Sequence, residues 1–106
     1  MNIVVFVTAS GKIEADKIAE KLIEEKLAAC VNIISGVDSV FWWENRIDRA
    51  SEVLLVIKSS KDKFAKIAET VKALHSYEVP EIIALPITDG YKPYLDWINE
   101  SIRKPS

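Results

Sequence analysis

Hydrophobic residues near the N-terminus change from a continuous run to a helical period. Residues 3–7 are all β-branched or aromatic, which is typical of a central strand buried on both faces. Ser10 follows this run, and its hydroxyl suits the N-cap of a helix. Apolar residues then recur every three or four positions, at Ala15, Ile18, Ala19, Leu22 and Ile23. This spacing predicts an amphipathic helix over roughly residues 12–27.

A second apolar pattern alternates with polar residues and starts at Ala29. It predicts a long strand that continues to residue 44, with a bulge or bend at Gly36. Residues 45–49 are polar except for Ile47 and predict a polar hairpin tip. Residues 51–58 then form the returning strand, so the two segments together predict one β-hairpin.

Two adjacent tryptophans mark the end of this long strand. Trp42 and Trp43 must point to opposite faces, because successive side chains alternate along a strand. In a chain this small, at least one of them therefore lies outside the core of a single subunit. With Glu44, they form a candidate interface between subunits.

The second half of the chain repeats the order of helix and strand. Ser59 or Ser60 is expected to cap a second helix, which ends near His75. Its apolar stripe consists of Phe64, Ile67, Ala68, Val71 and Leu74. Residues 80–88 predict a fourth strand, in which Pro86 favours an edge position because proline has no N–H for a central ladder. Residues 93–103 predict a short last helix.

The order strand, helix, strand, strand, helix, strand is the split βαβ pattern of the α+β ferredoxin-like sandwich. Residues 1–106 are expected to form a single domain of this class, closed by the short C-terminal helix. Two helices cover one face of a four-stranded sheet and leave the other face open. A partner subunit is the expected cover for that face.

Charge and cysteine content exclude several classes of protein. The net charge is −2 and charges of both signs are interspersed, so there is no basic surface for nucleic acid. No apolar run approaches the ~18 residues of a membrane helix. The N-terminal residues lack the basic segment of a signal peptide, and a single cysteine forms no internal disulfide. A cytoplasmic location is therefore expected.

Three segments carry a family resemblance. They are Ala-Ala-Cys-Val-Asn-Ile at residues 28–33, Phe-Trp-Trp-Glu at residues 41–44, and Leu-His-Ser-Tyr-Glu-Val-Pro-Glu-Ile at residues 74–82. In this order they resemble the divalent-cation tolerance family, CutA, and residues 90–97 look like the family's closing helix. Ser76 stands where the family usually has proline. The resemblance implies a homotrimer whose sheets pack face to face and whose hairpin arms pair with neighbouring edges.

The resemblance also implies an association with copper or another divalent cation, which folding would not require. His75 supplies an imidazole and Cys30 a soft thiolate, both suited to copper. The alternatives are a hydrogen bond from His75 to a backbone carbonyl and a packing role for Cys30. Some family members have a second cysteine at the position of Val7 and a second histidine at that of Leu74. This chain has neither residue, so its binding of copper is expected to be weak or to use surface carboxylates.

A second candidate site is a polar cleft between subunits. Tyr77 and Glu78 lie before a proline in an extended junction, where Thr8 and Lys58 from strand ends could join them around an anion or small molecule. In the alternative, Tyr77 packs and hydrogen-bonds across the trimer while Glu78 pairs with a surface lysine.

Nothing in the sequence forms a convincing catalytic arrangement. The glycines are scattered, so there is no phosphate-binding loop, and the pair His75 and Glu78 lacks an orienting group. The sequence therefore predicts a non-catalytic, trimeric, metal-associated module. The alternative is a trimeric signalling protein similar to the PII proteins, and the third hypothesis is a metal-dependent hydrolase.

Overall fold

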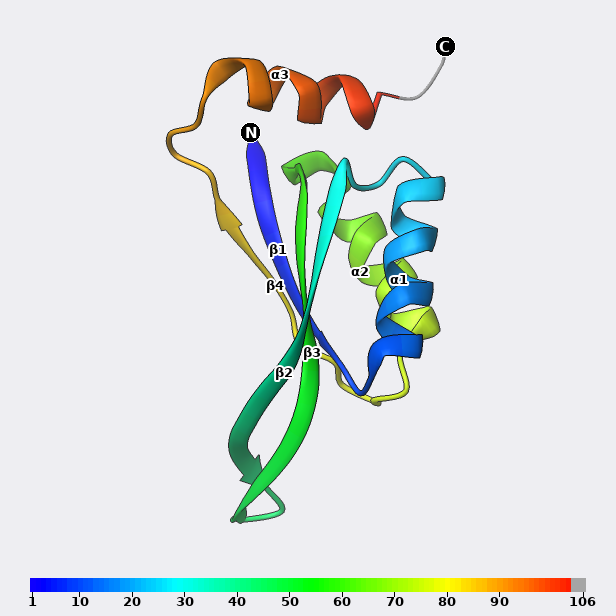
Figure 1. Cartoon of the computed structure of the whole chain (residues 1–106), viewed down its shortest axis with the longest axis vertical. Coiled ribbons are helices and arrows are strands. Elements are labelled where there is room, and N and C mark those ends of the chain that lie inside the picture. Colours follow the sequence, from blue (N-terminus) through cyan, green and yellow to red (C-terminus); the bar gives the residue numbers. More distant parts are fainter. Residues whose placement is uncertain (104–106) are drawn as a thin grey trace.

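Four strands form one antiparallel sheet in the order β2-β3-β1-β4 in the computed structural model, which describes residues 1–103. The elements are β1 (Asn2–Ala9), α1 (Lys12–Glu24), β2 (Cys30–Trp43), β3 (Arg46–Ser60), α2 (Phe64–Leu74), β4 (Ile82–Pro86) and α3 (Lys92–Ser101). Helices α1 and α2 cover one face, while α3 crosses the end of the sheet near the N-terminus (Figure 1). The predicted ferredoxin-like sandwich is confirmed.

The central strands β1 and β3 have one buried face. In β1 every second side chain is buried, from Ile3 to Ala9, and packs with the helices into the core. The residues between them are only half-buried. The central position predicted for residues 3–7 is confirmed, but burial on both faces is not reached within one chain.

Both ends of α1 differ from the sequence prediction. Its N-cap is Gly11 rather than Ser10, and the Ser10 hydroxyl donates instead to the Glu14 side chain. The helix ends at Glu24 rather than near residue 27, because Lys26 adopts a positive φ of 57°. The following backbone N–H, that of residue 27, closes the helix by donating to a carbonyl in its last turn.

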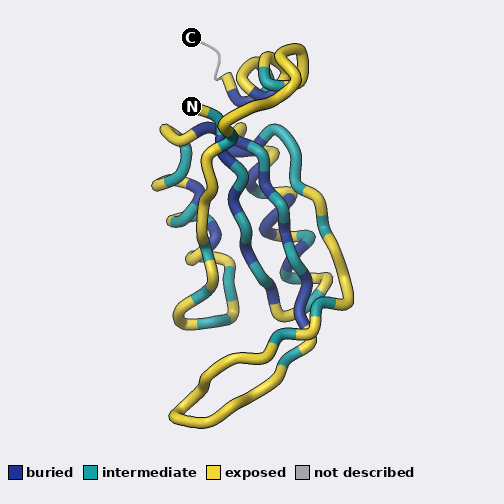
Figure 2. The backbone as a smooth tube through the Cα atoms, turned by 90° about the vertical axis from the view of Figure 1, so that its left-hand side faces the viewer, coloured by how far each residue is buried: buried dark blue, intermediate teal, exposed yellow. Residues whose placement is uncertain are grey.

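Strands β2 and β3 extend as a hairpin arm, defined here as residues 37–52, beyond the helices (Figure 1). The predicted bulge is confirmed at Gly36, whose φ is +79° and where the pairing register shifts. The tip is tighter than the predicted residues 45–49. Glu44 and Asn45 alone form the turn, with φ of 49° and 65°, so the strands pair up to Trp43 and Arg46. Most of the arm is exposed (Figure 2).

The second half of the chain follows the prediction with shifted boundaries. Ser60 precedes a short 3₁₀ turn, and its hydroxyl donates to the Asp62 carboxylate rather than to a backbone N–H. Strand β4 is shorter than residues 80–88, and its edge position, expected from Pro86, is confirmed. Helix α3 ends at Ser101 rather than at residue 103.

The sheet face opposite α1 and α2, called the open face here, is rich in apolar side chains. Ile34, Ile83 and Leu85 expose 48%, 51% and 47% of their surface there. They lie on the same face as half-buried residues of the central strands, because Ile83 pairs with Phe6 and Leu85 with Val4. A contiguous apolar surface of this kind is typical of a protein interface.

Candidate functional site

His75 follows the last residue of α2, and both of its ring nitrogens have backbone partners. Nε2 lies 2.7 Å from the carbonyl oxygen of Thr8, and Nδ1 lies 3.0 Å from the backbone N–H of Tyr77. A carbonyl only accepts and an amide N–H only donates, so the ring is neutral with its proton on Nε2. The side chain is fully buried. In this arrangement the imidazole has no free lone pair, and a metal would have to displace Tyr77.

A half-buried carboxylate, which the sequence pattern did not single out, lies beside this histidine. Glu14 Oε2 is 3.8 Å from His75 Nδ1 and accepts the Ser10 N–H at 2.9 Å, while Oε1 accepts the Ser76 N–H at 2.6 Å. Burial favours the protonated acid, but hydrogen bonds from Ser10 and Ser76 outweigh it and lower the pKa of Glu14 to about 2. A proline at position 76 would have no N–H to donate. Ser76 therefore adds a hydrogen bond to this junction.

Tyr77 forms its hydrogen bond within the chain. Its hydroxyl donates to Glu52 Oε2 of the same chain at 2.8 Å, whereas one alternative from the sequence was a hydrogen bond across the trimer. Burial raises the pKa of Tyr77 to about 12, together with this hydrogen bond and the charges of Glu52 and Glu14. The bond ties the segment after α2 to the base of the hairpin arm.

A pocket of about 460 Å³, called the arm pocket here, lies between the hairpin arm and residues 77–79. Its aromatic lining residues are Phe41, Trp43 and Tyr77, and its charged lining residues are Asp48, Glu52 and Glu78. The structure thus places Tyr77 and Glu78 in one pocket within the chain, together with Trp43. All of the lining charges are negative, so the arm pocket is unsuited to an anion.

Thr8 and Lys58 do not line the arm pocket. Lys58 pairs with Val4 on β1 and its ammonium group donates to the Asn32 side chain, whereas Thr8 pairs with Leu54. The two residues are therefore four positions apart along the ladder, which is roughly 13 Å. The four-residue cleft expected from the sequence is divided between two places on the sheet.

His75 and Cys30 are not neighbours either. Cys30 is a half-exposed free thiol at the start of β2, paired with Lys58 at the end of the sheet away from Thr8. Within residues 1–103 there is no group of three or more His, Cys, Asp and Glu side chains arranged to hold a metal ion. The structure places the two predicted metal ligands separately.

The candidate interface residues lie at the far end of the arm. Trp42 exposes 74% of its surface and Trp43 exposes 56%, on opposite sides of the strand. Glu44 occupies the first position of the two-residue turn. Of these three residues, Trp43 alone also lines the arm pocket.

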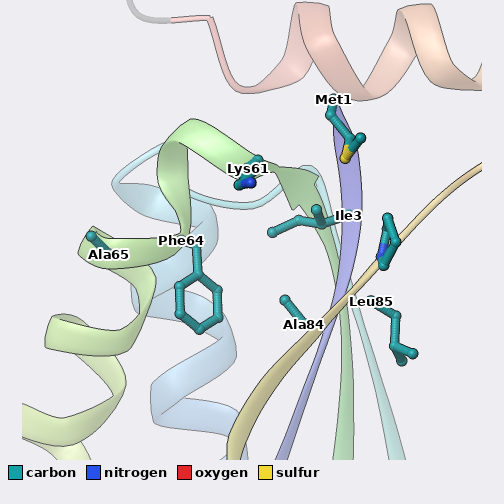
Figure 3. A pocket seen from close by; sticks show the side chains of 8 residues that line it. Met1, Ile3, Lys61, Phe64, Ala65, Ala84 and Leu85 are labelled. Carbon is teal, nitrogen blue, oxygen red and sulfur yellow. The ribbon is translucent and has the colours of Figure 1, made fainter.

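A second pocket, of about 510 Å³, lies between the start of α2 and the strands β1 and β4. Figure 3 shows Ile3, Phe64 and Ala84 pointing toward one another there, with Met1 beneath α3. Leu85 points the opposite way, as expected for the next residue of a strand. Apart from Lys61 the lining is apolar, so this pocket offers no carboxylate or imidazole. In the described part of the chain, no helix is long and apolar enough to cross a membrane.

Comparison with known sequences finds relatives along nearly the whole chain. The family model described as CutA1 divalent ion tolerance protein matches residues 3–101. A divalent-cation tolerance protein CutA of Archaeoglobus fulgidus is 46% identical over 102 residues, which are 96% of this chain and 99% of the relative. A chloroplastic protein CutA 1 of Oryza sativa is 47% identical over 97% of this chain but only 58% of its own length.

Solved structures share the fold at similar coverage. The structure of the periplasmic divalent cation tolerance protein CutA from Archaeoglobus fulgidus has a TM-score of 0.94 at 46% identity, covering 97% of this chain and all of the other. CutA from Xylella fastidiosa has a TM-score of 0.94 at 33% identity and covers 96% of this chain and 98% of its own. The Oryza sativa relative is described as chloroplastic and the Archaeoglobus fulgidus structure as periplasmic, so the relatives do not indicate one location for this chain.

Proposed function

Because this chain belongs to the CutA1 divalent ion tolerance family, we propose that it acts in tolerance to divalent cations as a non-catalytic homotrimer. The observation that carries the proposal is the match over residues 3–101 to the family model. A cytoplasmic location stays a prediction.

The open face supports the assembly. Three of its large apolar side chains, Ile34, Ile83 and Leu85, are about half exposed in a single chain. Burying them in a symmetric assembly would stabilise it through the hydrophobic effect, and closed symmetry would leave no sheet edge free to extend. The exposed Trp42 on the projecting arm offers a further contact to a neighbouring subunit.

Copper is the cation we propose, with weak binding. Cys30 supplies an accessible soft ligand, and the binding is weak because no cluster of further ligands within residues 1–103 surrounds it. His75 joins such a site only by giving up its hydrogen bond from the Tyr77 N–H, which would lower the affinity.

The site geometry also argues for a binding role over turnover. His75 would have to break a backbone hydrogen bond before it could move a proton, and no orienting carboxylate is bonded to its Nδ1. A signalling role that depends on an anion finds no support either, because Asp48, Glu52 and Glu78 surround the arm pocket.

Calorimetric titration of the purified protein with Cu(II) tests the metal proposal. The titration is repeated on Cys30→Ser and on His75→Gln, with the fold of each variant checked by circular dichroism. We expect weak binding that is reduced in Cys30→Ser and nearly unchanged in His75→Gln. Tight stoichiometric binding that disappears in His75→Gln would contradict the proposed arrangement.

A further inference from the structure

We propose that the arm pocket binds a small organic cation, one that carries aliphatic ammonium groups. This inference is independent of the copper proposal, because it uses neither Cys30 nor His75. It rests on three features of the pocket: an unbalanced buried carboxylate, aromatic walls, and a size that suits a small molecule.

Glu52 is the buried carboxylate whose charge no basic side chain of residues 1–103 neutralises. Only 8% of its surface is exposed, and Oε2 accepts the Tyr77 hydroxyl. Within residues 1–103, Glu52 has no ion pair with a basic side chain, and no protein donor reaches Oε1. Fully buried polar side-chain atoms in the same residues all have partners, so Oε1 keeps some access to solvent, and Glu52 lines the pocket. A largely buried carboxylate without a cation is costly unless something compensates its charge.

The other charges of the arm pocket have the same sign. Asp48 accepts the backbone N–H of Arg49 at 2.8 Å, and Glu78 lies on the exposed side of the pocket. The lining contains no lysine or arginine. The negative potential of three carboxylates therefore attracts a cation from solvent.

The carboxylates do not converge on one point that could hold a metal ion, as far as residues 1–103 show. Phe41, Trp43 and Tyr77 form the remaining walls, and their ring faces attract ammonium groups through cation–π interactions. The volume of about 460 Å³ falls within the roughly 300–1,000 Å³ typical of small-molecule sites. An extended organic cation can contact a carboxylate and a ring at once, whereas a compact metal ion cannot.

The probe is putrescine, a linear diamine, and its matched neutral control is the diol of the same chain length. Binding is followed by calorimetry and by ¹⁵N chemical shifts of the intact protein. We expect putrescine to bind at least about tenfold more tightly than the diol, because hydrogen bonds to charged groups are the stronger ones. Shifts should concentrate at residues 77–79 and at the base of the arm.

Three variants distinguish binding in the arm pocket from attraction by the overall charge of the protein. Glu52→Gln keeps an acceptor for the Tyr77 hydroxyl while removing the charge, and we expect it to weaken putrescine binding about tenfold. Glu78→Gln is the substitute if that variant does not fold. Glu20→Gln removes the same charge from the exposed side of α1 and should leave binding unchanged.

Three results would overturn the proposal. Equal responses to putrescine and the diol would remove the role of charge. Binding that survives both Glu52→Gln and Glu78→Gln would place the cation elsewhere. Failure of the wild-type protein to respond would mean that the pocket is closed in the assembly, for instance by a basic side chain of a neighbouring subunit.

Discussion

The Nε2 atom of His75 lies 2.7 Å from the carbonyl oxygen of Thr8, so the end of α2 is hydrogen-bonded to the end of β1, 67 residues earlier in the chain. The other ring nitrogen accepts the Tyr77 N–H and thereby shapes the turn into the next segment. Through Tyr77 and its bond to Glu52, the junction is connected to the hairpin arm. His75 thus joins three parts of the fold that are distant in sequence.

The two hydrogen bonds of His75 predict a graded loss of stability. His75→Phe fills the buried space but leaves the Thr8 carbonyl and the Tyr77 N–H without partners, which should cost about 1–3 kcal/mol in the free energy of unfolding for each group left unsatisfied. His75→Gln keeps an amide N–H that can reach Thr8 and should lose less. Urea unfolding at one fixed protein concentration measures both. Equal losses in the two variants would contradict the assigned hydrogen bonds.

Glu14 predicts a specific acid sensitivity. Its pKa is about 2 in the folded protein against an ordinary value of 4.5, so between these values the unfolded chain binds more protons. The stabilisation by Glu14 is therefore fully present above pH 4.5 and is lost as the pH falls toward 2. Glu14→Gln should flatten the stability curve in this window, whereas Glu20→Gln on the same helix should not. Parallel curves for Glu14→Gln and the wild type would show that the carboxylate is not held as described.

Gly36 predicts a backbone effect without a steric one. A side chain added there would meet no atom within 4 Å, but the φ of +79° disfavours every residue with a Cβ. Gly36→Ser should destabilise the protein by about 1–2 kcal/mol. Gly11 also has open space and has an extended φ of −174°, so Gly11→Ser should be neutral or slightly stabilising as a better N-cap. Thermal unfolding of the two variants measures the difference, and similar midpoints would count against the bulge.

Trp42 predicts a contribution to assembly that is not visible in one chain. With 74% of its surface exposed, truncation to alanine should change the core little but should weaken a trimer by about 2–4 kcal/mol if it is an interface hot spot. Ile13→Ala, on the first turn of α1 with 75% exposure, is the control. Light scattering during dilution should show earlier dissociation for Trp42→Ala alone. If the two variants dissociate alike, the arm is not part of the interface.

The sequence predicts the features that depend on local chemistry. The continuous apolar run of residues 3–7 identifies β1, Gly36 supplies the positive φ of the bulge, and Pro86 favours an edge strand. The hairpin tip is predicted too long, because four of the five residues 45–49 are polar and Ile47 alone gives no alternating signal. Glu44 in a left-handed conformation is also not expected from its residue type.

The candidate site is harder to predict from the sequence than the fold, because it depends on pairing between distant segments. Thr8 and Lys58 both lie near strand ends, but β1 and β3 are antiparallel, which places these ends apart. The bond between Ser76 and Glu14 joins residues 62 positions apart. Only the spacing of Ser10 and Glu14 hints at it, since an acid in the first turn of a helix often bonds back to the preceding segment.

The molecular mass of the wild-type protein in solution tests the central claim most directly. Multi-angle light scattering over a dilution series should give three times the 11.9 kDa of one chain, because the open face and the arm are proposed to be covered by two further copies. A mass of one chain that persists at high concentration would contradict the account, since the exposed Ile34, Ile83 and Leu85 would then face water.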